Sequence, residues 1–159
     1  WWDRQLAEIT PLPVWHDIAK IYETGPEYDL WAVTSHSGMF AFSTVSNPLY
    51  LEASAEKLGH FHIQINSEAA EKRGIKDEDE IYIESAHGKV KGRAKLREGL
   101  RPDTVVIHGQ FGHSTTPLSK DTRELIPNIT ALSKADIGMV AEDGGVRDTV
   151  KIKVYKATE

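Results

Sequence analysis

The chain has 159 residues, no cysteine and a formal net charge of −5, and 27% of its residues are charged. This length fits one domain with a substantial core, since a chain of about 150 residues buries roughly 68 to 70% of its unfolded surface. The absence of cysteine excludes a disulfide framework, a thiolate nucleophile and cysteine-ligated zinc or iron–sulfur sites. The acidic balance argues against nonspecific binding to nucleic acid or to an anionic membrane, because both require a basic surface.

Neither a membrane helix nor a signal segment is evident. No apolar run approaches the ~20 residues that a membrane helix needs, and no basic-then-apolar segment opens the chain. We therefore predict no direct membrane insertion. The sequence begins at Trp1 without a methionine, so we expect a piece of a longer protein from which any targeting signal has been removed.

Residues 1–27 are predicted to form an N-terminal arm or linker ahead of one domain over residues 28–159. The segment contains three prolines and four large aromatic residues: Pro11, Pro13, Pro26, Trp1, Trp2, Trp15 and Tyr22. Proline-bounded segments are typically extended. Solvated linkers seldom contain so many large rings, so the arm should pack either on the outer face of its own domain or on a missing neighbour.

An apolar strand is expected over residues 29–34, followed by the small-residue loop Ser35-His36-Ser37-Gly38, which can approach a ligand closely. A neutral His36 side chain can donate one hydrogen bond. After this loop come apolar residues that are either core or the wall of an aromatic slot, namely Met39, Phe40, Phe42 and Val45. The alternative is an ordinary strand, loop and strand with satisfied turn polar groups.

Residues 49–59 are predicted to form a brief helix closed by Gly59, and residues 60–65 a strand in which His60 and His62 share a face. Two histidines at this spacing could bind a metal. No third ligand is evident nearby, and most such pairs are solvent-facing strand residues.

The most regular stretch begins at Asn66. Asn66 and Ser67 are N-cap residues and Gly74 is the expected left-handed C-cap, so we predict a short helix over residues 67–73.

A β-hairpin is predicted next, with strands over residues 80–85 and 89–96 joined by a turn at 86–88, because apolar and polar residues alternate at the two-residue period of a strand. The inward-facing residues would be Ile81, Ile83, Ser85, Val90, Gly92, Ala94 and Leu96. Positive charges on the return strand opposite Glu80 and Glu84 would help to fix the pairing.

A short strand over Thr104–His108 then leads into the loop Gly109-Gln110-Phe111-Gly112-His113. This loop carries neither a phosphate-loop Lys-Ser/Thr signature nor a GxGxxG fingerprint, but its backbone, amide, ring and imidazole suit a heterocycle with an attached phosphate. The alternative is a plain turn. Residues 114–127 are polar and irregular, Asn128 heads the short apolar segment 129–132, and residues 149–155 alternate as a closing strand.

These features together resemble a known domain. The Gly74-Ile75-Lys76-Asp77 turn, the Ser85-x-x-Gly88 hairpin and the Phe-Gly-His loop, in this order, resemble the C-terminal dinucleotide-binding domain of the dimethyl sulfoxide reductase family of molybdenum and tungsten oxidoreductases. Residues 28–47 resemble that domain's first strand and cofactor loop, and residues 128–154 its last loop and closing strand. The resemblance covers roughly residues 28–155.

The resemblance implies a mainly β fold, a six-stranded double-psi β-barrel with short helices, whose loops at one end clamp a molybdopterin guanine dinucleotide with molybdenum or tungsten. The domain would orient the cofactor and tune the metal's potential, and would not be catalytic alone. By resemblance, the cofactor-binding residues are Thr34, Ser35, His36, Ser37, Gly38, Phe40, Ser43 and Asn47 in the first loop, His108, Gly109, Gln110, Phe111, Gly112 and His113 in the second, and Asn128 in the third. His36 stands where the family often has arginine, which removes a fixed positive charge.

The implied partners are the remaining domains of the parent catalytic subunit and an iron–sulfur electron-transfer subunit, in the prokaryotic cytoplasm or periplasm. The residue that holds the metal belongs to another domain. The Phe-Gly-His loop and the long segment after it resemble the thiosulfate, polysulfide and phenylacetyl-coenzyme A branch more than the nitrate reductases.

Two other functions are considered. Small β-barrels with the same hairpin also serve as protein-interaction modules without an organic cofactor. A hydrolase using Ser35 or Ser43 with His36 is disfavoured, because no Gly-x-Ser-x-Gly elbow and no ordered third partner is present.

Overall fold

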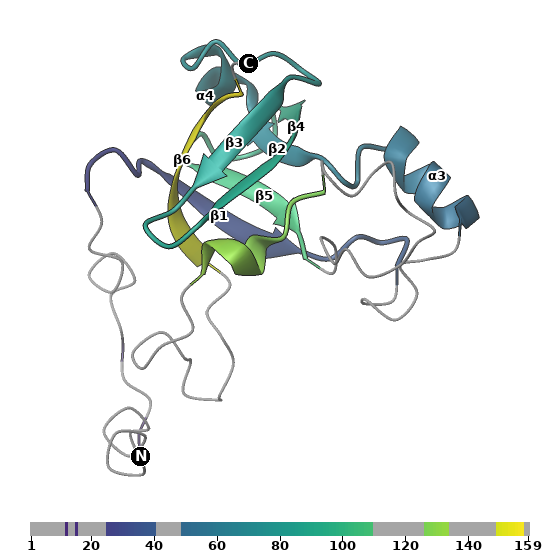
Figure 1. Ribbon diagram of the computed structural model, residues 1–159, viewed down its shortest axis with the longest axis horizontal. Helices are drawn as coiled ribbons and strands as arrows, with labels where there is room; N and C mark the ends of the chain where they lie inside the picture. Colours follow the sequence, from purple (N-terminus) through teal and green to yellow (C-terminus); the bar gives the residue numbers. More distant parts are fainter. Residues whose placement is uncertain are drawn as a thin grey trace.

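The computed structural model describes residues 25–40, 49–109, 126–133 and 149–157, together with Leu12 and Trp15. Within these ranges six strands close into a barrel in the order β1-β5-β2-β4-β3-β6 (Figure 1). The strands are β1 (Leu30–Ser35), β2 (Ile63–Asn66), β3 (Glu80–Glu84), β4 (Lys89–Arg97), β5 (Thr104–His108) and β6 (Thr149–Lys156). The predicted six-stranded double-psi β-barrel is confirmed, and β6 closes it by pairing antiparallel with both β1 and β3.

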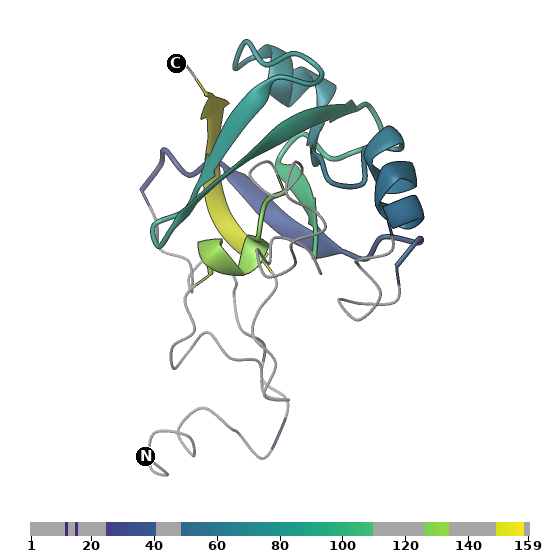
Figure 2. The same ribbon diagram turned by 45° about the vertical axis from the view of Figure 1, so that its right-hand side comes forward.

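In the described ranges three short helices accompany the barrel: α3 (Leu49–Lys57), α4 (Ser67–Glu71) and the 3-10 helix η4 (Ile129–Leu132). Figures 1 and 2 show α3 beside the barrel, near the end at which β1 finishes, and η4 across one opening. Among the described residues no helix has the length and apolar character needed to cross a membrane.

Two pairs of neighbouring strands are parallel, β1 with β5 and β2 with β4, and the other pairs are antiparallel. In a parallel pair the carboxyl ends of both strands meet at the same place. Ser35 therefore lies opposite His108 at the end of the first pair, and Asn66 lies opposite Arg97 at the end of the second. The loops that follow β1 and β5, predicted to share a site, leave the barrel side by side.

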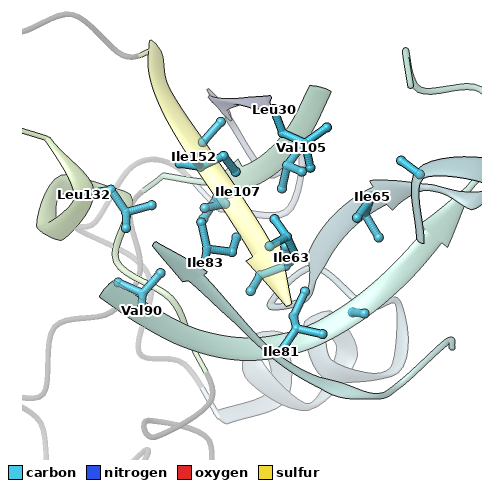
Figure 3. Packing of buried hydrophobic residues seen from close by; sticks show 14 of the residues in the cluster. Leu30, Ile63, Ile65, Ile81, Ile83, Val90, Val105, Ile107, Leu132 and Ile152 are labelled. Atoms are coloured by element: carbon cyan, nitrogen blue, oxygen red, sulfur yellow. The ribbon is translucent and has the colours of Figure 1, made fainter. Parts of the chain in front are cut away.

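The barrel interior is filled by inward-facing aliphatic side chains from every strand (Figure 3). Its largest fully buried members are Ile63, Ile65, Ile81, Ile83, Val105, Ile107, Leu132 and Ile152. Each side chain of this size stabilises the fold by roughly 1.5 to 3 kcal/mol when fully buried. The predicted inward set of the hairpin is confirmed, with Leu96 only partly buried at the rim.

Local sequence explains the short helix α4. The Asn66 side-chain oxygen accepts hydrogen bonds from the backbone N–H groups of Glu68 (2.9 Å) and Ala69 (3.2 Å), so Asn66 is the N-cap. Gly74 has φ +66°, the left-handed conformation predicted for it. The α-helix itself ends at Glu71, and the rest of the predicted segment is a turn.

The strand predicted over residues 60–65 is wrong at its start, because β2 begins only at Ile63. The N–H groups of His60 and His62 instead donate to Ala55 and Gly59 within the turn after α3, so the ladder cannot use them. His62 is 5% exposed and its Nε2–H donates to Glu78 at 2.7 Å. The two histidines therefore do not form a solvent-facing strand pair, and the described residues contain no group of three His, Asp or Glu placed to hold a metal.

The strand register places positive charges opposite both glutamates of the hairpin, as predicted. Glu80 lies opposite Arg93 and Glu84 opposite Lys89. The ion pairs themselves form with the neighbouring cations, Lys91 for Glu80 and Lys153 for Glu84. Of the predicted arm, the structure describes Leu12, Trp15 and the last three residues of the segment, and Trp15 is 88% exposed.

Candidate functional site

The candidate site is built on the adjacent ends of β1 and β5. The side chains of Ser35 and His108 join there, with 2.7 Å between the Ser35 Oγ and the His108 Nδ1. The backbone N–H of Gly109 donates to the Ser35 carbonyl at 3.0 Å, which carries the ladder one residue into the loop. A side chain placed on Gly109 would lie 3.9 Å from the Thr34 Cβ. The first and second predicted loops therefore begin in contact.

A second serine–histidine contact lies beside the first. The Ser37 Oγ is 2.6 Å from the His60 Nδ1 and also accepts a hydrogen bond from the Met39 N–H at 3.3 Å. The His60 and His108 rings have centroids 5.6 Å apart and planes tilted by 36°. Ser35, Ser37, His60 and His108 thus form one group of polar side chains, which we name the Ser–His cluster.

Gln64 joins this cluster from strand β2. Its side-chain Nε2 lies 2.9 Å from the His108 Nε2, so both nitrogens of that imidazole have a side-chain partner. Gln64 and His60 were not predicted as site residues. Both lie in the segment predicted as one strand, and only the antiparallel pairing of β2 with β5 brings Gln64 near His108.

A small apolar cluster outside the barrel supports the first loop. Phe40, Ala55 and Phe61 are buried together, and Met39, Leu51 and Ile126 pack against them. The Phe40 and Phe61 ring centroids are 6.2 Å apart. Phe40, predicted as a cofactor-binding residue, is only 6% exposed. In this structure it fixes the loop after β1 against α3 and the turn that carries His60.

The electrostatics of the cluster favour neutral imidazoles. Burial, followed by the positive charge of Arg97, lowers the pKa of His60. Burial also lowers the pKa of His108, and His60 and Arg97 add to the effect, while a hydrogen bond to the Ser35 backbone opposes it. At neutral pH the cluster therefore offers hydroxyl groups and neutral imidazoles, on which the positive charge of Arg97 acts.

The third predicted loop is attached to a different part of the barrel. The Asn128 side-chain oxygen accepts a hydrogen bond from the Thr130 N–H at 3.0 Å and so caps η4. The Ser85 hydroxyl donates to the Leu132 carbonyl at 2.7 Å, which ties η4 to the β3–β4 hairpin. Among the described residues no hydrogen bond joins Asn128 to the Ser–His cluster.

The predicted site residues therefore have different positions. Thr34, Ser35, Ser37, His108 and Gly109 are brought together at the ends of β1 and β5, and His36 and Gly38 are exposed on the same loop. Phe40 is buried and Asn128 caps η4. The remaining predicted residues, Ser43, Asn47, Gln110, Phe111, Gly112 and His113, lie outside the described ranges.

Comparison with known proteins identifies the family. The family model described as "Molydopterin dinucleotide binding domain" matches residues 31–154. The chain belongs to this family. It is a molybdopterin dinucleotide-binding domain of the kind found in the dimethyl sulfoxide reductase family, as the sequence predicts.

One relative is similar in sequence, and one solved structure has a similar fold. The thiosulfate reductase molybdopterin-containing subunit PhsA of Salmonella typhimurium is 30% identical over 100 residues, which are 59% of this chain and 13% of that protein. The solved structure of acetylene hydratase from Pelobacter acetylenicus matches with a TM-score of 0.67 and 18% identity, over 92% of this chain and 21% of that chain. The chain thus spans a small part of the length of each protein.

Proposed function

We propose that this chain is the C-terminal cofactor-binding domain of a molybdenum or tungsten oxidoreductase and that it holds a molybdopterin guanine dinucleotide at the ends of β1 and β5. The observation that carries the proposal is the meeting of Ser35 and His108 at these ends, inside the segment that matches the family. When bound, the cofactor would supply the redox chemistry at its metal. The chain by itself would not turn over a substrate.

The residues present fit a heterocycle with attached phosphates. Ser35 and His60 provide a hydroxyl and an imidazole that can donate or accept hydrogen bonds, and the buried Ser37 positions His60. Arg97, at the end of β4, adds a positive charge that acts on His60 and His108. His36 and Gly38, exposed on the loop after β1, allow close approach of a ligand to the backbone.

The two alternative functions have less support. An interaction module would not need the family match over residues 31–154. A hydrolase would need a carboxylate to orient the histidine of a Ser35–His108 pair, but the second nitrogen of His108 contacts the Gln64 amide.

The parent enzyme is proposed to include the remaining domains of a catalytic subunit and an iron–sulfur partner subunit, with no membrane-inserted segment in this domain. The match to a thiosulfate reductase subunit supports the thiosulfate and polysulfide branch over the nitrate reductases.

Isothermal titration of the purified chain tests the proposal. The ligands would be an extracted, oxidised pterin dinucleotide, guanosine diphosphate and cytidine diphosphate. We expect the guanine compounds to bind more tightly than cytidine diphosphate, and Ser35→Ala to weaken them about tenfold, the loss of one good hydrogen bond. Ser67→Ala, on helix α4 at the end of β2, is the matched control and should bind like the native chain. Equal affinity for the two diphosphates would contradict a guanine site.

A further inference from the structure

In the hydrogen bonds that join Gln64, His108 and Ser35, the donor and the acceptor of each bond can be assigned. The atom of Gln64 that faces His108 is the amide nitrogen, 2.9 Å from the imidazole Nε2. An amide nitrogen only donates hydrogen bonds, so the His108 Nε2 must accept. A neutral imidazole with an accepting Nε2 carries its proton on Nδ1, and that nitrogen lies 2.7 Å from the Ser35 Oγ. His108 therefore donates to Ser35.

This direction leaves the Ser35 hydroxyl proton for another acceptor. A serine hydroxyl has one proton and two lone pairs, and here a lone pair receives the His108 proton. The Ser35 side chain is half-buried, and among the described residues the hydrogen-bond partner of its Oγ is His108. A group that receives the hydroxyl proton must be an acceptor, and the best acceptors are anionic oxygens.

The surrounding charges favour an anion. Arg97 is exposed and forms no ion pair with any carboxylate in the described ranges, whereas the two preceding outward cations of β4 are paired, Arg93 with Glu56 and Lys95 with Asp77 and Glu78. The charged or titratable groups that act on His108 are His60 and Arg97. Arg97, at the end of β4, therefore acts on the cluster through its positive charge, and no carboxylate of the described residues acts on His108 as a competing acceptor.

We propose that Gln64, His108 and Ser35 form a directed hydrogen-bond chain that holds the Ser35 hydroxyl as a donor toward a phosphate group, with Arg97 attracting the phosphate by its charge. Gln64 and His108 act as positioning residues, and Ser35 is the group that touches the ligand. The identification of the phosphate as part of the dinucleotide rests on the proposed function. The assignment of donors and acceptors in the hydrogen-bond chain is independent of the proposed function.

The direction is tested by long-range ¹H–¹⁵N correlation on the ligand-free chain at pH 8, which shows which ring nitrogen of His108 carries the proton. We expect the proton on Nδ1. Gln64→Glu has the same shape but only accepts, so it should place a proton on Nε2, a change that a merely structural role for Gln64 would not produce. Gln64→Met, which removes the donor and keeps the length, should give a mixture of tautomers. A native His108 with its proton on Nε2 would overturn the proposal.

The ligand class is tested by following the His108 and Ser35 signals during separate titrations with inorganic phosphate, guanosine diphosphate and guanosine. Phosphate and guanosine diphosphate should shift both residues and guanosine should not. Arg97→Gln should weaken phosphate binding about fivefold, as expected for the loss of one solvent-screened charge. Arg101→Gln is the matched control, since Arg101 is exposed and paired with Asp103. Shifts by guanosine alone, or equal affinity in Arg97→Gln, would overturn the phosphate assignment.

The two titrations also separate this inference from the proposed function. Tighter binding of guanosine diphosphate than of inorganic phosphate supports the dinucleotide as the source of the phosphate. Equal binding, with His108 protonated on Nδ1, supports a site for free phosphate and contradicts the guanine part of the proposed function.

Discussion

The two parallel strand pairs of the barrel end in polar residues, and they use them differently. At the end of β2 and β4, Asn66 is buried and its side chain serves the fold: the oxygen caps α4 and the nitrogen donates to the Leu100 carbonyl at 2.7 Å. At the end of β1 and β5, Ser35 and His108 are half-buried and bond to side chains.

This difference distinguishes polar side chains that stabilise the fold from polar side chains that a ligand can reach. Buried polar atoms are normally satisfied by the backbone, and Asn66 follows that rule. The Ser–His cluster instead joins side chains from three segments, and Ser35, unlike the buried Ser37, is only half-buried. Of two ends with the same strand geometry, the β1–β5 end is therefore the better candidate for binding.

The largest expected effect is at the structural end. Asn66→Ala removes the cap of α4 and takes the side-chain donor from the partly buried Leu100 carbonyl, so we expect a loss of about 2 to 3 kcal/mol in the free energy of unfolding. Urea denaturation measures it. Asn128→Ala is the control, because Asn128 accepts a single hydrogen bond at the shorter helix η4 and should cost about 1 kcal/mol. An equal loss of unfolding free energy in the two variants would contradict a special structural role for Asn66.

The next effect is at the binding end. Ser35→Ala should weaken guanosine diphosphate about tenfold but change the free energy of unfolding by less than about 1 kcal/mol, since the side chain is only half-buried. Titration calorimetry and urea denaturation of the same variant measure the two quantities. A large stability loss with unchanged binding would mean that this end is structural like the other.

A smaller effect concerns pH. The pKa values of His60 and His108 are lowered in the folded chain, mainly by burial, so the unfolded chain binds more protons below neutrality. Their contribution to stability is present above the unfolded value of about 6.5 and is lost as pH falls through this value toward the lower folded values. Denaturation at several pH values from neutral to mildly acidic measures the decline.

Replacing both histidines, as His60→Asn with His108→Gln, should flatten that decline. The paired carboxylates Asp77, Glu78 and Glu84 have lowered pKa values, so their loss of stability belongs to a more acidic range. An unchanged slope near pH 6.5 in the double variant would contradict burial of these imidazoles.

The smallest effect is expected for a surface ion pair away from both ends. Lys91→Gln removes the pair with Glu80, both of which are partly exposed on the hairpin. Such pairs contribute about 0 to 1 kcal/mol, so stability and ligand binding should both stay close to those of the native chain. A change above about 1 kcal/mol would show that this hairpin contact supports the barrel more than its exposure suggests.

Much of the fold could be predicted because its signals are local. The N-cap at Asn66, the left-handed Gly74 and the alternating residues of β3, β4 and β6 each depend on neighbours in the sequence. The error at His60 and His62 has the same origin. Their alternation suits a strand, but Gly59 with φ +69° makes a turn that uses their N–H groups.

The site could be predicted only in part, because its contacts are distant in sequence. The family resemblance implies Ser35 and His108 as site residues, and their pairing across 73 residues follows from the parallel order of β1 and β5. Gln64 and His60 contact His108 and Ser37 across 44 and 23 residues, and no local pattern marks either one. Their roles depend on tertiary geometry.

The most direct measurement is an amide-shift map of the ¹⁵N-labelled chain with guanosine diphosphate at millimolar concentrations. We predict shifts at Ser35 to Gly38, at His60 and at His108 and Gly109, and none from Asn66 to Gly74. Shifts concentrated around Asn66 and α4, or no shift at Ser35 and His108, would contradict the assignment of the dinucleotide site to the ends of β1 and β5.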